Sequence, residues 1–180
     1  MRAVILVEGT SDQRAVEALA RRRGRNLEGE GIEVVAIGGA HAIGAALGRF
    51  GPSGLNVELA GLCDAGEESA FVRGLERAGL GTSLNRAGLE ALGFYVCEND
   101  LEYELVRAAG VEAVLGIIER QGELSAFGTF QKQLAKRDLG VEEQLWRFMW
   151  NRKIRYAPLL VDALDLDRVP RPLDGVLAHV

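Results

Sequence analysis

The feature that most constrains the fold is an alternation of short apolar runs with amphipathic stretches over the first part of the chain. The apolar runs predict four strands, at Ala3–Val7, Glu33–Ile37, Glu58–Cys63 and Gly93–Cys97. Helical patterns fill the gaps, at Asp12–Arg23, His41–Phe50, Glu67–Ala78, Arg86–Leu92 and Asp100–Ala109. The runs are continuously apolar, which is typical of strands covered by helices on both faces. The pattern therefore predicts an α/β fold with a parallel sheet of about four strands flanked by helices.

The pattern changes after Gly110, where helices follow one another without a strand between them. These helices are expected at Val111–Arg120, Glu123–Leu134, Val141–Trp150 and Ile154–Leu164. The tail carries Pro170 and Pro172, and we expect it to lie along the body of the protein. We therefore predict a core at residues 1–110 and a helical extension at 111–180 packed on that core.

Composition limits the classes of protein to which the chain can belong. Its 180 residues are 48% hydrophobic and 26% charged, enough for a single compact core. The formal net charge of -5 argues against a surface that binds nucleic acid everywhere. The first apolar run is too short for a secretory leader, and no stretch has the length of a membrane span. We expect a cytoplasmic protein, with Cys63 and Cys97 as buried free thiols.

Acidic residues follow three of the predicted strands. Glu8 and Asp12 follow the first, Asp64 the third, and Asp100 and Glu102 the fourth. The carboxyl ends of parallel strands meet at one edge, where open α/β sheets place their chemistry. Anionic carboxylates brought together there need a cation or a proton between them, and hard oxygen ligands favour Mg²⁺ or Mn²⁺.

Structural roles explain some of these acids equally well. Asp12 is a good helix cap, and Asp64 favours a helix amino terminus through the macrodipole. Glu102 alone reads as a solvated helix residue. Glu8 is harder to explain in this way, because an acid directly after a buried strand gains nothing from burial.

The order of these motifs resembles a TOPRIM domain, and most of all the TOPRIM half of the OLD (overcoming lysogenization defect) family of nucleases. The resemblance places the family glutamate on Glu8, a second acidic position on Asp12, and the Asp-x-Asp strand end on Asp64-Ala65-Gly66. The Asp-Leu-Glu segment of OLD-like members falls on Asp100-Leu101-Glu102. The resemblance implies an acidic cluster that holds Mg²⁺ near a phosphodiester. It also implies a basic residue late in the chain, and Lys153 looks like its counterpart.

The sequence departs from the family pattern in two respects. Gly66 stands where Asp-x-Asp has its second aspartate, so either Glu67 or Glu68 would supply that oxygen or the second metal would rest on Asp100 and Glu102. No P-loop motif is present either, so we expect a stand-alone domain that would need a separate ATPase partner. The glycine-rich segment Gly38–Gly44 lacks the P-loop lysine and reads as a tight turn, with His41 capping or packing there.

The resemblance favours a nuclease that uses two metal ions, Mg²⁺ or Mn²⁺, on nucleic acid, with DNA as the expected substrate. Glu8, Asp12 and Asp64 would hold one ion, Asp100 and Glu102 would help to hold the second, and Lys153 would stabilise the developing charge. Phosphate contacts are predicted from two basic clusters, Arg21, Arg22 and Arg25, and Lys132, Lys136 and Arg137, which otherwise read as solvated helix faces.

Two other functions stay open. The chain would be a non-catalytic TOPRIM module that binds or regulates a partner, or a nucleotidyl transferase with the same metal chemistry. The late aromatic residues Trp146, Trp150 and Tyr156 are expected in the core and rim of the helical part. The sequence allows a homodimer but does not require one.

Overall fold

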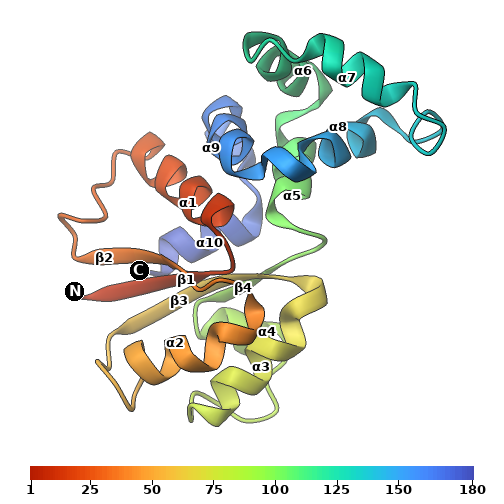
Figure 1. Ribbon diagram of the computed structural model, residues 1–180. Helices are drawn as coiled ribbons and strands as arrows, with labels where there is room; N and C mark the ends of the chain where they lie inside the picture. The colour runs from red at the N-terminus through yellow and green to blue at the C-terminus, as the bar shows by residue number, and fades with distance from the viewer.

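Four parallel strands form the centre of the molecule in a computed structural model that describes all residues, Met1–Val180 (Figure 1). They are β1 (Ala3–Val7), β2 (Ile32–Ala36), β3 (Glu58–Asp64) and β4 (Phe94–Cys97), in the order β2-β1-β3-β4. Every neighbouring pair runs parallel, with Ala3 of β1 facing both Ile32 and Glu58 in register. The predicted parallel α/β fold is therefore confirmed.

The central strand β1 is buried on both faces, because its apolar residues divide between two cores. Ala3, Ile5 and Val7 pack into one core, whereas Val4 and Leu6 point into the other. The first core lies under α1 (Thr10–Arg22), α9 (Lys153–Ala163) and α10 (Arg171–His179), which Figure 1 shows above the sheet. The second lies over α2 (Ile43–Phe50), α3 (Glu68–Arg77) and α4 (Arg86–Ala91), below the sheet.

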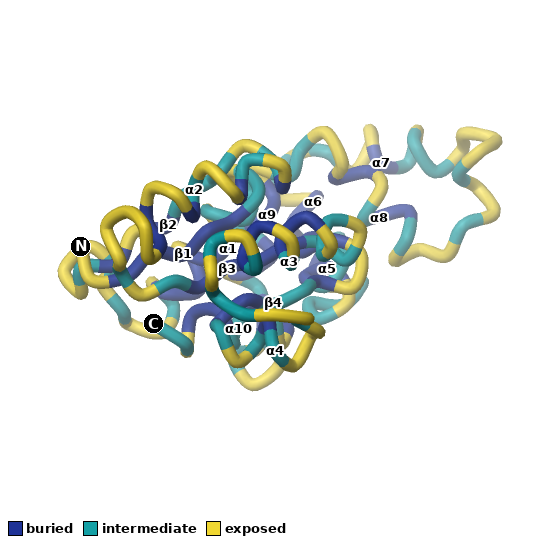
Figure 2. The backbone as a smooth tube through the Cα atoms, turned by 90° about the horizontal axis from the view of Figure 1, so that it is seen from below, coloured by how far each residue is buried: buried dark blue, intermediate teal, exposed yellow.

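The remaining helices project from one end of the sheet. They are α5 (Leu101–Ala109), α6 (Val111–Arg120), α7 (Leu124–Gln131) and α8 (Val141–Met149), and short 3-10 helices η1 to η4 lie at Ala40–Ala42, Ala65–Glu67, Trp150–Arg152 and Leu166–Arg168. Phe127, Phe130 and Phe148 pack their rings together and hold α7 against α8. The connection between α7 and α8 is mostly exposed in Figure 2. None of the helices is both long enough and apolar enough to cross a lipid bilayer.

The chain returns to the sheet after α8, so its last helices complete the first core. Helix α9 packs along α1, and α10 packs against β3 and β4. The tail, for which the sequence predicted no particular element, forms α10 at Arg171–His179. Pro170 is the N-cap of this helix and Pro172 lies in its first turn, where a missing N–H leaves no backbone bond unmade. The division into 1–110 and 111–180 stays a prediction.

Candidate functional site

Glu8 and Asp64 meet at the carboxyl ends of β1 and β3. The Glu8 carboxylate accepts a hydrogen bond from the Asp64 backbone N–H, with 2.9 Å between Oε1 and N. The backbone carbonyl of Glu8 accepts from the N–H groups of Gly38 and Gly39, at 3.0 and 2.9 Å. Both glycines have positive φ, so the glycine-rich segment turns sharply and its amides are used to fix Glu8.

Asp12 caps α1 and also faces the acidic cluster. It occupies the third position of the helix, and its Oδ2 accepts from the Gly9 backbone N–H at 2.9 Å. Gly9, rather than Ser11 or Asp12, is the N-cap residue. Asp12 therefore has the capping role that the sequence allowed, but this role leaves its Oδ1 free for another partner.

Asp100 is held in place by three different donors. It is the N-cap of α5, and its Oδ1 accepts from the Tyr103 backbone N–H at 2.7 Å. Trp146 Nε1 donates to both carboxylate oxygens, at 2.9 and 3.1 Å, and Lys153 Nζ donates to Oδ2 at 2.7 Å. This carboxylate has little freedom to turn.

Glu102 is the most deeply buried acid of the cluster. Its side chain is 1% exposed, and Lys153 Nζ lies 3.0 Å from Oε2. Its other oxygen, Oε1, is buried without any hydrogen-bond partner. A buried carboxylate oxygen left unpaired costs free energy, so this atom needs a cation, a proton or a water molecule.

Crowding of the carboxylates shows in their pKa values. Burial, together with the negative charge of Glu102 and Glu8, raises the pKa of Asp12 to about 7. Burial and the charges of Glu8 and Asp12 raise the pKa of Asp64 to about 8, and burial also raises the pKa of Glu8. Burial alone would lower the pKa of Lys153, but Glu102 and Asp100 more than offset it and raise that pKa above its usual value. The cluster therefore has more negative charge than Lys153 alone neutralises.

The donor set fits a divalent cation in its chemistry. Carboxylate oxygens are the ligands that Mg²⁺ and Mn²⁺ prefer, and the unpaired Oε1 of Glu102 is available to such an ion. As they stand, however, no three acidic, histidine or cysteine side chains are gathered closely enough to hold a metal ion. Lys153 already pairs with Asp100 and Glu102, so ion binding requires side chains to rearrange.

The first predicted basic cluster lies at the opposite end of α1 from Asp12, and its side chains bind the protein itself. Arg22 donates to the carbonyls of Val161 and Leu164, at 2.8 and 2.6 Å. Arg21 pairs with Asp162 at 3.0 Å, and Arg25 bonds to Glu30 and to the carbonyls of Leu177 and Val180. These arginines fasten α1 to the carboxyl ends of α9 and α10.

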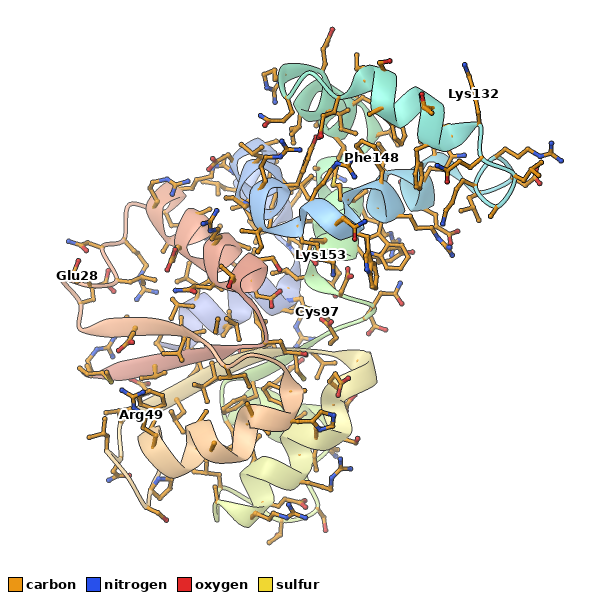
Figure 3. The ribbon with its side chains drawn as sticks, in the orientation of Figure 1. Glu28, Arg49, Cys97, Lys132, Phe148 and Lys153 are labelled. Atoms are coloured by element: carbon orange, nitrogen blue, oxygen red, sulfur yellow. The ribbon has the colours of Figure 1, made fainter.

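The second predicted basic cluster lies in the connection between α7 and α8. Lys132 directly follows α7, and Figure 3 shows it at the far tip of the helical part, well away from Lys153. Lys136 lies over the Phe130 ring, 5.5 Å from its centroid, and Arg137 pairs with Asp138 at 3.6 Å. The structure therefore brings together the predicted acids and Lys153, but not the two basic clusters.

Two residues that the sequence analysis did not assign to the site support it. Trp146 orients Asp100, as described above, and Glu123 fixes the segment that carries Lys153. The Glu123 carboxylate pairs with Arg152 at 3.2 Å and Arg155 at 2.5 Å, and it accepts a hydrogen bond from Tyr156. No sequence motif marks either residue, because their partners are far away in the chain.

A parallel sheet in the order 2-1-3-4 with carboxylates at the ends of β1 and β3 is the architecture of a TOPRIM domain. Residues 1–65 match the family of the overcoming lysogenization defect protein-like TOPRIM domain. The first part of the chain is therefore similar to an OLD-like TOPRIM domain.

Solved structures extend this likeness to nearly the whole chain. The C-terminal region of the Xanthomonas campestris pv. campestris OLD protein matches with a TM-score of 0.79 and 27% sequence identity, over 99% of this chain and 91% of that chain. The C-terminal region of the Burkholderia pseudomallei OLD protein has the same fold, with a TM-score of 0.77 at 22% identity over 99% of this chain and 96% of that one. No curated protein sequence matches the chain.

Proposed function

We propose that the protein cleaves phosphodiester bonds of nucleic acid, DNA in the first place, with Mg²⁺ or Mn²⁺ as its cofactor. The observation that carries this proposal is the group of carboxylates around Glu8 and Asp64, in which the buried Oε1 of Glu102 has no partner. The negative charge of such a site is not fully neutralised by Lys153, so a cation would be attracted to it. Its carboxylates are also the ligands that Mg²⁺ and Mn²⁺ prefer. The likeness to OLD-like TOPRIM domains supports the same assignment.

Five carboxylates are available as ligands. Glu8, Asp12 and Asp64 would hold one ion at the ends of β1 and β3, and Asp100 with Glu102 would help to hold a second one at the start of α5. Bound divalent ions supply a reactive water at neutral pH and stabilise the charge on the attacking and leaving oxygens. The Asp64 N–H keeps one oxygen of Glu8 fixed, and the indole of Trp146 does the same for Asp100.

Lys153 has a role of its own in this proposal. Its ammonium group lies within hydrogen-bond distance of Asp100 and Glu102 and is held there by the Glu123 cluster on both sides of it in sequence. If bound cations replaced Lys153 as the partners of those carboxylates, the ammonium group would be free to donate to a phosphate oxygen. A positive charge at that point would stabilise the additional negative charge of the transition state.

A second candidate is a TOPRIM module without catalysis, and specific observations favour it. Lys153 already neutralises two carboxylates, Gly66 offers no ligand, and the acids do not form a ready three-ligand cluster. In that case the site would bind a partner protein or a structural cation. The two functions differ in one respect, because only the nuclease turns over substrate when the metal is supplied.

Cleavage of supercoiled plasmid DNA and of single-stranded RNA in Mg²⁺, Mn²⁺ or EDTA tests the proposal. We expect metal-dependent nicking that Glu8→Ala and Asp64→Ala abolish while the circular dichroism spectrum stays unchanged. Glu58→Ala is the matched control, since Glu58 lies at the other end of β3 and pairs with Arg2 on the surface. Normal cleavage by the Glu8 variant would exclude the nuclease assignment, and no cleavage by the wild type in either metal would favour the module.

We also propose that an ATPase acts together with this site. The solved proteins of this fold are described as C-terminal regions of OLD proteins, so they belong to larger chains. Family resemblance assigns ATPase activity to the rest of such chains. If an OLD-type ATPase domain added in trans leaves the cleavage rate unchanged with and without ATP, this part of the proposal is wrong.

A further inference from the structure

A basic groove lies between the first turn of α1 and the start of α9. Its volume is about 590 Å³, and it is lined by four basic side chains and no carboxylate: Arg14, Arg152, Lys153 and Arg155. Such a lining is unusual in a protein whose formal net charge is -5. The groove therefore favours a negatively charged occupant over a positively charged or neutral one.

The groove lies next to the acidic site. Thr10 and Ser11 form one wall, and in sequence they lie between Glu8 and Asp12. Lys153 lies on the opposite wall, and its ammonium group contacts Asp100 and Glu102. Figure 3 shows Lys153 where α9 approaches α5 above the sheet. An occupant of the groove would therefore lie beside the acidic site, with Lys153 between them.

Trp150 exposes an aromatic surface in this groove. The side chain is 58% exposed, and its neighbour Ile154 is 50% exposed. The ring is nevertheless fixed, because it packs edge to face on Trp146 with 5.9 Å between centroids, and Lys153 Nζ lies 4.8 Å from its centroid. A rigid, exposed indole among basic groups offers a surface on which a planar base can stack.

Part of the positive charge of the groove is free. Arg14 has no carboxylate partner and makes only a weak hydrogen bond, at 3.4 Å, to the carbonyl of Ile154. Arg152 and Arg155 share the single carboxylate of Glu123, so this group keeps a net positive charge. Phosphate groups would therefore find a partner at Arg14 on one wall and at the arginine pair on the other.

We propose that this groove binds a single nucleic-acid strand, with one unpaired base stacked on Trp150 and its neighbouring phosphates on Arg14 and the arginine pair. The proposal rests on the proposed function, since it names the form of substrate that the acidic site receives. Base pairs in a duplex hide their faces in the stack, so a duplex must fray or flip a base to use Trp150. Single strands, DNA or RNA, are therefore preferred over duplexes.

A second cavity is less suited to nucleic acid. It measures about 760 Å³ and lies beside β4, one of the two edge strands of the sheet. Its arginines are largely neutralised, because Arg86 pairs with Glu68 and Glu98, and Arg171 pairs with Glu90. The groove at Trp150 is distinguished from it by an exposed aromatic ring and by Lys153, which contacts Asp100 and Glu102.

Fluorescence anisotropy of labelled 12-nucleotide strands tests the proposal on the full chain. Binding is measured in EDTA and again in Ca²⁺, at low salt, with DNA, RNA and a duplex of the same length. Trp150→Ala should weaken binding of a single strand by about 5- to 150-fold, which is the effect of losing one base–aromatic stack. Trp150→Phe should restore most of the affinity, and Leu134→Ala, which removes another exposed apolar side chain, should change nothing.

An abasic strand provides the decisive comparison. Removing the bases should weaken binding to the wild type but have little further effect on Trp150→Ala, because both changes remove the same contact. Additive losses, a Trp150→Ala variant that binds normally, equal affinity for the duplex, or no binding by the wild type in either condition would each overturn the proposal. Comparison of the DNA and RNA strands shows which of the two the groove prefers.

The charge of the groove is tested by a second variant. Arg14→Ala should weaken binding of intact and abasic strands equally and reduce the salt dependence, because Arg14 would contact phosphate only. Arg49→Ala is the matched control, since Figure 3 shows Arg49 on the opposite side of the sheet. These assays contain no cleavage step. If the protein binds strands through Trp150 but cleaves nothing, this inference is supported and the nuclease assignment is wrong. If it cleaves nucleic acid but does not bind strands through Trp150, the nuclease assignment is supported and this inference is wrong.

Discussion

Lys153 supplies positive charge to a group of carboxylates for which the sequence also predicts bound metal ions. It lies among acids from the ends of β1 and the start of α5, and it pairs with the two that are most buried, Asp100 and Glu102. Removing either partner of a buried ion pair leaves the other without compensation. The ammonium group therefore stabilises the cluster in the metal-free protein and has to release its partners when ions bind.

Gly66 is the residue at which the ligand set departs from the family pattern, and the structure leaves room to restore it. A Cβ atom at this position would meet no atom within 4 Å, and the backbone there does not have the positive φ that favours glycine. We predict that Gly66→Asp tightens Mn²⁺ binding by about tenfold, because it adds a carboxylate to the end of β3.

Isothermal titration with Mn²⁺ measures this change, and Gly66→Ala is the control for the loss of glycine itself. An affinity equal to that of the wild type would show that residue 66 does not face the ion. In that case the second aspartate of the family pattern would have no counterpart at this position.

The elements around the site depend on contacts between distant segments, of which the Glu123 cluster is the best defined. Glu123 precedes α7, yet its three partners lie in η3 and at the start of α9. Burial alone would raise the pKa of Glu123, but hydrogen bonds from Tyr156, Arg155 and Arg152 lower it to about 2. The ionised carboxylate is therefore what joins these two elements.

This pKa gives a pH dependence with a definite sign. Because the pKa of Glu123 is lower in the folded state than its usual 4.5, its stabilisation is complete above about pH 4.5 and is lost as the pH falls towards about 2. We predict that Glu123→Gln lowers the free energy of unfolding at pH 7 by about 1–3 kcal/mol. The difference from the wild type should shrink through the acid range.

Urea titrations at pH 7, 4 and 3 measure the difference. Glu119→Gln, in the preceding helix, is a suitable control, since this residue makes no ion pair. A destabilisation by Glu123→Gln that stays constant down to pH 3 would mean that the charge of Glu123 is not its source.

The sequence predicts the elements best where they are local. Continuous apolar runs such as Ala3–Val7 identified all four strands, and the helix at Val111–Arg120 has the predicted bounds. Helix α10 was not predicted in the tail that carries Pro170 and Pro172, although proline fits the first turn of a helix. The roles of Trp146 and Glu123 could not be predicted, because hydrogen bonds across 46 and 33 residues leave no local pattern.

The whole molecule should respond to the metal, since its acids are brought together only by folding. An ion that binds the folded chain and not the unfolded one stabilises it by mass action. With Mn²⁺ at about 100 times its dissociation constant, the gain is about 2.7 kcal/mol, which for a protein of this size raises Tm by roughly 5 to 10 °C.

Thermal unfolding with EDTA or with increasing Mn²⁺ measures this shift. The rise in Tm caused by Mn²⁺ should be much smaller in Asp64→Asn than in the wild type. In Asp162→Asn it should equal that of the wild type, because Asp162 pairs with Arg21 on the surface. A shift of the same size in both variants would mean that the ions bind elsewhere on this acidic protein.

The attachment of α10 to the sheet has a consequence for how the chain acquires its structure during synthesis. Arg25, close to the amino terminus, binds the carbonyls of Leu177 and Val180, and α10 covers β3 and β4. The apolar face above these strands therefore stays uncovered until residues 171–180 have left the ribosome exit tunnel. A nascent chain stalled before Pro170 should be much more sensitive to protease than the folded protein, because its core cannot close without α10.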